Sequence, residues 1–542
     1  MYSDNFHRPT NNPSAKQTSA GIDPDAQTAL TTLHSVVEKM PKSEVALGTR
    51  CGAHGAVAGS AILLGDFAKA AEIIKGVMPI TRSDPAVLSE LACDHLFEAL
   101  APYCVAAGAT NNSHLIGEVL NTLRQPSHVT LPGNTKGAGI PVLAGAIRTL
   151  AAHSQQHAIR EILRFCENPE LQARILVETL SNTVCNLSEE VGRQNFTVTL
   201  YNVAAISREF LVVDALDLPR ARRFDAWVLK AFVSCVEGDP DTCEKLLRGL
   251  PEGMKGDPTV SWLYGFSLGT RIRSDDDIKS AVIMKSVMRL CGSLTDLAAL
   301  EEIYPWLGRG LVSATRGVQG RRVSAITRVL QDTLPAESGG RQELRALRHI
   351  HRVACAVHDH DEAAYSGAID RLHRVFQKSS DSDCYVFVSS VADMICTDLL
   401  VPDRAVRTRL ADALVRGTHD LGPDTRTMLQ DLLLAAGFTT QAQSISLSDV
   451  PYLNERLLHT LRLECARGDA ASRGSLSSSA AAQAIAAQGW WEDLAREVSS
   501  HGTNRDIGEI VSAAARARES DPESLGEVCD AVFWGLARRL KR

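Results

Sequence analysis

The sequence predicts an all-α fold, an α-solenoid or superhelix built from antiparallel helical hairpins. Three observations carry this prediction. The chain has 542 residues, several times the size of one compact domain, so it is either divided into domains or built as an array of small units. Hydrophobic residues make up 44% of it but aromatic residues only 5%, which favours closely packed helices over a thick sheet-based core. Finally, a helix–turn–helix pattern recurs along the chain.

The first clear copy of this pattern spans residues 57–79. An apolar run ends at Gly65 and Asp66, and a second helix is predicted beyond them. Its apolar stripe consists of Phe67, Ala70, Ala71, Ile74 and Val77. Neither helix can bury its stripe alone, so the two must pack on each other and leave apolar surface for a neighbouring pair. Such an array is expected to be elongated and to offer an extended concave surface for binding.

Taken in order, the chain divides into a leader and three helical regions. Residues 1–25 are rich in Ser, Thr, Asn and Pro, so they cannot offset the entropy of ordering and are predicted to form a disordered leader. N-terminal helical hairpins are expected over 26–124, a central repeat region over 142–340 and a C-terminal repeat region over 341–542. The loop at 125–141, rich in Pro and Gly, marks the first boundary between them.

The copies of the pattern share a turn residue that is followed five positions later by a small or apolar residue. The six pairs are Gly65 and Ala70, Gly238 and Cys243, Gly292 and Leu297, His358 and Ala363, Gly437 and Ala442, and Gly489 and Leu494. The segment GDFAKAAEIIKGV, which begins at Gly65, resembles the second half of a tetratricopeptide repeat. This resemblance implies a superhelix that binds proteins or peptides. The first-helix signature and the period of about 34 residues are absent, so no groove residue is carried over from that family.

The polar, serine-rich and acid-poor leader is similar to the N-termini of bacterial type III secreted effectors. This resemblance implies export from a bacterium into a host cytosol and a role in virulence. The cysteines agree with a cytoplasmic protein, because all thirteen are scattered singly and no C-x-x-C occurs. We therefore expect reduced, mostly buried thiols.

Several classes of function are disfavoured by composition and motifs. The net charge of −7 argues against a dedicated nucleic-acid binder, which needs a basic face. No apolar run is long enough to span a bilayer. No hydrolase, kinase, dinucleotide-binding or zinc-protease motif occurs, and no cofactor is predicted. The sequence thus favours a non-catalytic scaffold or effector that binds a partner protein or peptide.

Two basic clusters are the candidate binding residues. The first consists of Arg220, Arg222 and Arg223, and the second of Arg309, Arg316, Arg321, Arg322 and Arg328. Each cluster could contact an acidic partner or a phosphate. The alternative is that the arginines only form a solvated face of the protein. The second cluster lacks the aromatic residues that single-stranded nucleic acid requires.

Five histidines lie within residues 349–373, and they suggest the alternative of a helical enzyme with a metal-assisted site. They are His349, His351, His358, His360 and His373. A metal needs ligands that converge, and His351, His358 and His360 are the best candidates. Their spacing matches no known ligand motif, and HDHDE at 358–362 is typical of a capped, solvated turn. We therefore expect a turn there, with no metal.

The last 18 residues, 525–542, are predicted to form an amphipathic helix. Its apolar stripe consists of Leu525, Val528, Cys529, Val532, Phe533, Leu536 and Leu540, and its end carries four cations. Cations near a helix C-terminus complement its dipole, and arrays need a last helix with a polar outer face. The sequence therefore predicts a capping helix, with contact to a membrane surface as the alternative.

Overall fold

The structure, a computed structural model, describes residues 23–40, 47–77, 90–124, 139–166, 168–185, 196–211, 223–274, 297–376, 404–416, 421–447, 457–462, 479–518 and 521–540, with Val388, Ala392 and Ile395. Within these residues there are helices and no strand, so the predicted all-α fold is confirmed. None of the described helices is both long enough and apolar enough to cross a membrane.

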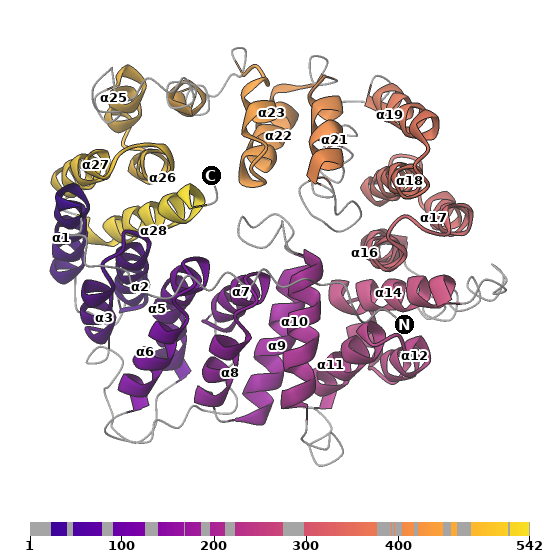
Figure 1. Ribbon diagram of the computed structural model, residues 1–542, viewed down its shortest axis with the longest axis horizontal. Coiled ribbons are helices and arrows are strands. Elements are labelled where there is room, and N and C mark those ends of the chain that lie inside the picture. Colours follow the sequence, from indigo (N-terminus) through magenta and orange to yellow (C-terminus); the bar gives the residue numbers. More distant parts are fainter. Residues whose placement is uncertain are drawn as a thin grey trace.

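The N-terminal helices form two layers of stacked hairpins (Figure 1). They are α1 (Pro24–Lys39), α2 (Leu47–Leu63), α3 (Phe67–Lys75), α5 (Glu90–Ala109), α6 (His114–Arg124), α7 (Gly139–Ala152) and α8 (Gln156–Phe165). In one layer α5 packs between α2 and α7, and in the other α6 packs between α3 and α8. Each hairpin therefore covers the apolar surface that its neighbour leaves open.

The middle of the chain continues this stacking. Its helices are α9 (Pro169–Val184), α10 (Phe196–Phe210), α11 (Arg223–Val236), α12 (Pro240–Arg248), α13 (Glu252–Lys255), α14 (Pro258–Ser274), α16 (Leu297–Thr315), α17 (Gly320–Thr333), α18 (Gly339–His358) and α19 (Glu362–Phe376). The most extensive packing joins α14 to α16, and α16 in turn contacts α18. The core consequently runs without a break from the first region into the third.

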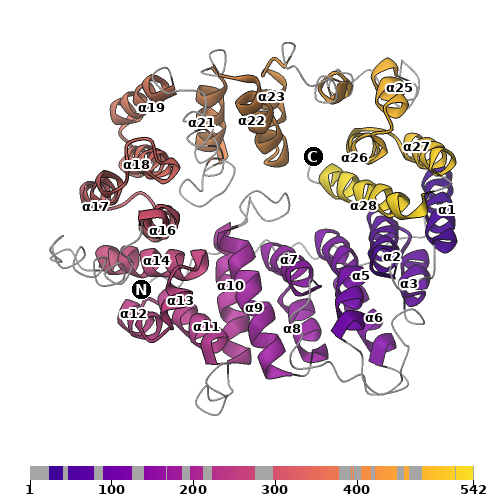
Figure 2. The ribbon, with the colours of Figure 1, turned by 180° about the vertical axis from the view of Figure 1, so that it is seen from behind.

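The first and the last described helices pack against each other, which the sequence did not predict. The last helices are α21 (Arg404–Arg416), α22 (Pro423–Ala435), α23 (Thr439–Gln443), α25 (Ala480–Ala487), α26 (Trp491–His501), α27 (Asn504–Ala517) and α28 (Pro522–Arg539). The helix α28 packs on α2, and α27 packs on α1. Figures 1 and 2 show the yellow and indigo helices side by side from both directions. The array is thus a ring and not an elongated body.

The predicted C-terminal helix exists, but it does not cap an open array. Six of the seven residues of its stripe are buried as expected, with Val532 and Phe533 both at 0% exposure, whereas Leu540 at its end is 48% exposed. The stripe faces the other end of the chain, because a Cβ on Gly59 of α2 would lie 2.7 Å from the Phe533 ring. The described part of this helix therefore closes the ring, and most of its apolar face is occupied by α2 and α26.

Short turns with one left-handed residue join the paired helices. Gly65 has a φ of 87°, and Gly238 has the same value. After Gly65, the N–H of Asp66 donates to the Ala61 carbonyl at 2.8 Å, which closes the first helix in a Schellman motif. The Asp66 carboxylate then accepts from the Lys69 N–H at 2.9 Å and caps the second helix. A Gly-Asp dipeptide therefore ends one helix and starts the next.

Four of the six predicted pairs are confirmed by the burial of their second member. Ala70, Cys243, Ala442 and Leu494 are all fully buried against the paired helix. Gly292 lies outside the described residues. The pair His358 and Ala363 is wrong by two positions: His360 has the left-handed φ of 55°, and Tyr365 is the buried residue. Ala363 is exposed, since it lies on the outer side of α19.

Two further turns of the same type were missed because they contain no glycine. Asn111 and Ser154 both have a φ of 58°, and the residues five positions later, Ile116 and Ile159, are each 1% exposed. The hydrogen-bond pattern is that of the glycine turns, with the Gln155 N–H donating to the Leu150 carbonyl at 2.9 Å. A search for glycine alone therefore overlooks part of the repeat.

The predicted limit at 124 coincides with the end of α6, whereas three other predicted limits fall inside helices. Pro24 and Asp25 already belong to α1, and residues 1–22 of the predicted leader lie outside the described residues. Pro141 sits in the first turn of α7, where proline is tolerated, so the central region begins earlier than residue 142. The boundary at 340 falls inside α18.

The eight cysteines whose side chains the structure describes are all free thiols, and most are buried, as expected for a reduced protein. Burial raises the pKa of the thiols of Cys51 and Cys104 to about 12. These thiols are therefore neutral packing groups.

A buried arginine connects α22 to α26 and provides a test of ring integrity. Arg462 donates to Asp431 at 2.9 Å and to Glu497 at 2.7 Å, and the Glu497 side chain is only 4% exposed. We expect Arg462→Ala to lower the unfolding free energy by about 3 kcal/mol, because it removes one partner of a buried ion pair. The exposed pair of Arg505 and Glu509 supplies the control: Arg505→Ala should change it by less than about 0.5 kcal/mol. Urea unfolding measures both, and equal effects would contradict this assignment.

Candidate functional site

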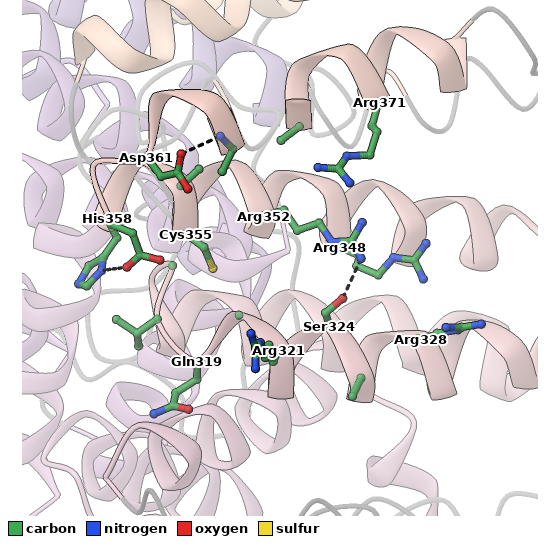
Figure 3. Close-up of a pocket in the computed structure, with 18 of the residues that line it drawn as sticks. Gln319, Arg321, Ser324, Arg328, Arg348, Arg352, Cys355, His358, Asp361 and Arg371 are labelled. Atoms are coloured by element: carbon green, nitrogen blue, oxygen red, sulfur yellow. Dashed lines mark hydrogen bonds and ion pairs between the residues drawn. The ribbon is translucent and has the colours of Figure 1, made fainter. Parts of the chain in front are cut away.

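An open groove of about 1250 Å³ lies across α17, α18 and α19. Figure 3 shows the side chains that line it, with basic residues contributed by all three helices. We call it the arginine groove, and its five arginines are Arg321, Arg328, Arg348, Arg352 and Arg371. A groove with five arginines is unusual on a chain whose net charge is −7. Its local field favours anions even though the whole molecule repels them.

Helical spacing places these arginines on the groove-facing sides of their helices. Arg321 and Arg328 are seven residues apart on α17, and Arg348 and Arg352 are four apart on α18, so each pair shares one face. On α19, Arg371 follows Ala364 and Ala368 on the same face. Because the alanine side chains at those two positions are short, they leave space in the groove, and the long arginine side chains can extend across it.

The aspartates of the groove are already engaged. Asp332 lies 3.5 Å from Arg328 and 3.8 Å from Arg341. Asp359 pairs with His358 at 3.1 Å. Asp361 accepts from the Ala364 N–H at 2.9 Å and caps α19. These carboxylates therefore form no ion pair with the arginines in the middle of the groove, and the charge of Asp332 offsets the positive charge around Arg348 by less than the neighbouring arginines add to it.

Four of the five arginines form no ion pair with any carboxylate that the structure describes. They are Arg321, Arg348, Arg352 and Arg371. Arg352 donates only to the Ser324 hydroxyl at 3.4 Å, and Arg371 donates to the Gly367 carbonyl at 2.9 Å. The Nε of Arg348 is buried without a hydrogen-bond partner. The groove thus holds guanidinium groups whose donors are largely unused.

The arginines are close enough to disfavour one another's charge. Burial lowers the pKa of Arg348, and the charges of Arg352, Arg328 and Arg345 lower it further. Burial also lowers the pKa of Arg352, with a second contribution from Arg371. Guanidinium groups stay charged at neutral pH, so the repulsion is not relieved by deprotonation. A bound anion would relieve it.

The start of α17 opens into the same groove. Its N-cap, Gln319, has a left-handed φ of 58° and gives the first turn no side-chain hydrogen bond. Gly320 fits here because a Cβ would lie 2.8 Å from the sulfur of Cys355. The positive end of the helix dipole therefore adds to the field of the arginines.

The structure separates the predicted arginine candidates. Arg321 lines the groove, whereas Arg322 lies beside it on α17 and is not part of the lining. Arg309 is engaged elsewhere, because it pairs with Glu343 at 2.5 Å and stacks on Trp306 at 4.7 Å. In the first cluster, Arg220 and Arg222 lie outside the described residues, and Arg223 begins α11.

Sequence reasoning missed Arg348, Arg352 and Arg371, although a signal was present. The stretch from Arg345 to Arg352 places arginines three or four residues apart, which puts them on one helical face. The histidines interleaved with these arginines obscure this spacing in the sequence. Arg371 comes to lie beside these arginines because α18 and α19 pack as a hairpin around the turn at 359–361. This packing exists only in the folded chain.

The histidines do not converge on one point. The Nε2 of His351 lies 3.1 Å from the Thr315 hydroxyl inside the core, whereas His358 and His360 are exposed in and beside the turn. The side chain of His373 lies outside the described residues. The residues that the structure describes contain no group of three potential ligands able to hold a metal ion.

The thiol at the groove is not an activated nucleophile. Cys355 lies 3.6 Å from the Nδ1 of His351, a distance that suggests a cysteine–histidine pair. Burial raises the pKa of Cys355 to about 11 and lowers that of His351 to about 4. Both groups are therefore neutral at pH 7, and no thiolate–imidazolium pair forms.

A second pocket, about 1190 Å³, lies where the ring closes and is lined by residues of α2, α5, α7, α26 and α28. Its charged groups are mostly engaged within the protein. Arg148 donates to the Asn182 carbonyl at 2.8 Å, and Glu492 pairs with Arg518 at 2.9 Å. The arginine groove is therefore the stronger candidate for binding a charged partner.

Comparison of this chain with protein-family models, with curated proteins and with solved structures found no match, so the reading of its function rests on the geometry of the arginine groove.

Proposed function

We propose that this chain is a binding protein and that its arginine groove holds an acidic segment of a partner protein. The observation that carries this proposal is the group of four arginines, from three helices, that have no carboxylate partner among the described residues. Arginine clusters of this kind recognise acidic motifs through charge-assisted hydrogen bonds. The predicted resemblance to tetratricopeptide repeats points in the same direction.

The shape of the groove supports a peptide as the ligand. The groove is partly open to solvent, which allows an extended segment to enter it from the surface. Its lining includes Ala325, Ala364 and Ala368, and the neighbouring Val329 is 42% exposed. These residues offer apolar contacts between the charged ones, as peptide-binding surfaces require.

The proposal is tested with a fluorescein-labelled oligoglutamate peptide and the full chain, by fluorescence polarisation. We expect binding that weakens steeply with salt, since it depends on exposed charges. The double variant Arg348→Glu/Arg352→Glu should weaken binding by at least about tenfold, because it replaces two cations by two anions. Circular dichroism would verify that the variant remains helical.

The matched control reverses the charge of an arginine on another part of the ring. Arg505 is 70% exposed on α27 and makes only a surface pair with Glu509. Arg505→Glu should leave the affinity within about twofold of the unchanged protein. If both variants weaken binding equally, the effect is one of overall charge and the groove is not the site.

A further inference from the structure

We propose that the anion held in the arginine groove is a phosphoryl group on a side chain of the partner, bound by Arg348, Arg352 and Arg371. This inference rests on the proposed function and specifies its ligand. It makes recognition of the partner dependent on phosphorylation.

The three arginines approach one place from two helices. Figure 3 shows Arg348 and Arg352 on α18, with Arg371 extending toward them from the neighbouring helix α19. Arg371 and Arg352 are close enough for one charge to influence the other, as are Arg352 and Arg348. A ligand bound at this place can therefore accept hydrogen bonds from planar guanidinium groups that approach it from different directions.

The charges of the groove are concentrated at this place. At one end Asp332 pairs with Arg328, and at the other end lie Asp359 and Asp361. Between them, the three arginines have no carboxylate partner among the residues that the structure describes. Asp332 offsets only part of the charge around Arg348, so the excess positive charge is local and central. Such a place suits one compact, highly charged group better than a long run of single charges.

A phosphoryl group matches this place better than a carboxylate. It carries a charge of about −1.5 to −2 at neutral pH and has three acceptor oxygens, whereas a carboxylate carries one charge on two oxygens. Three guanidinium groups can each donate to a different phosphoryl oxygen, and arginine pairs with phosphate through two parallel hydrogen bonds. The Ser324 hydroxyl, which accepts from Arg352, lies in the same lining and can donate a further hydrogen bond.

The test compares short neutral peptides that differ at one position only, which is phosphoserine, glutamate or serine. Isothermal titration calorimetry with the full chain is expected to show the phosphoserine peptide binding at least about tenfold more tightly than the glutamate peptide. The serine peptide should not bind measurably. Inorganic phosphate should compete, but more weakly than the phosphoserine peptide, because it lacks the contacts of the peptide chain.

Variants distinguish this inference from the general binding of acidic segments. Arg371→Gln should remove most of the preference for phosphoserine over glutamate, because it takes away one of the three guanidinium groups at the phosphoryl position. Arg505→Gln on α27 serves as the matched control and should leave this preference unchanged. Circular dichroism confirms that each variant is folded.

The outcomes separate the two proposals. Equal affinity for the phosphoserine and glutamate peptides overturns the phosphoryl inference and leaves acidic binding intact. Equal affinity for inorganic phosphate and the phosphoserine peptide shows a site for free phosphate, which overturns recognition of a phosphorylated partner. If neither the phosphoserine peptide nor oligoglutamate binds, the proposed function fails together with the inference.

Discussion

Lowering the pH from 7 to 5 is expected to reduce the unfolding free energy of this protein by roughly 6 kcal/mol, through three buried histidines. His54 and His351 are each 1% exposed, and His349 is 6% exposed. The pKa of each is lowered from its usual value of 6.5 to about 4. Burial is the main cause in all three, because the interior disfavours the charged imidazolium.

The sign follows from which state binds the protons. Below pH 6.5 the unfolded chain protonates all three histidines, whereas the folded protein keeps them neutral until the pH nears 4. The unfolded state is therefore favoured progressively as the pH falls through this window, by about 2 kcal/mol per histidine at pH 5. Nearby cations reinforce burial: Arg50 acts on His54, and Arg348 and Arg352 act on His349.

The measurement is urea unfolding at a series of pH values between 7 and 5. His54 is the best position for a variant, because neither ring nitrogen has a hydrogen-bond partner. His54→Leu should leave the stability at pH 7 nearly unchanged and remove about 2 kcal/mol of the loss at pH 5. A stability that stays flat from pH 7 to pH 5 in the unchanged protein would refute this account.

Replacing Gly265 by alanine is expected to destabilise the fold by about 4 kcal/mol or more, which is the upper end of single substitutions. Gly265 lies on α14, where a Cβ would be 1.9 Å from the carbonyl oxygen of Leu307 on α16. On the opposite helix, a Cβ on Gly310 would be 2.0 Å from the carbonyl oxygen of Trp262. Backbone faces backbone at this crossing, so no side chain can rotate away to make room.

A helical glycine in open space provides the matched control. Gly145 lies inside α7, and no heavy atom is within 4 Å of a Cβ added there. Gly145→Ala should therefore raise the stability by up to about 1 kcal/mol, since alanine loses less backbone entropy in a helix. Chemical unfolding of the two variants compares them directly. If both substitutions changed the free energy of unfolding by a similar amount, helix propensity would decide the outcome, and not the contact between α14 and α16.

Local features of the fold were predictable because they depend on a few adjacent residues. The Gly-Asp turns at Gly65 and Gly238 combine a residue that adopts positive φ with one that caps a helix. The buried Ala70 and Cys243 follow at a fixed helical distance. At His358 the same reasoning chose the wrong turn residue, because the left-handed conformation was taken up by His360, a side chain that gives no advance sign of it.

The candidate site was only partly predictable. Arg321 and His358 were singled out separately, and the hairpins formed by α17, α18 and α19 bring both into the lining of one groove. Arg371 is far from Arg321 in the sequence and reaches the groove only because α19 folds back beside α18. Whether a basic side chain stays unpaired depends on which carboxylates its neighbours present, and no sequence pattern states this.

The sequence by itself determined the all-α class, the hairpin unit and the burial of its stripes, because helical periodicity and turn chemistry act over a few residues. Only the tertiary structure decided that the array closes into a ring and that four arginines remain without a carboxylate among the described residues. Closure depends on small rotations between successive hairpins, which add up around the whole array until α28 meets α2. Such sums are set by packing between distant segments, as at Gly59 and Phe533, and so become visible only in the folded chain.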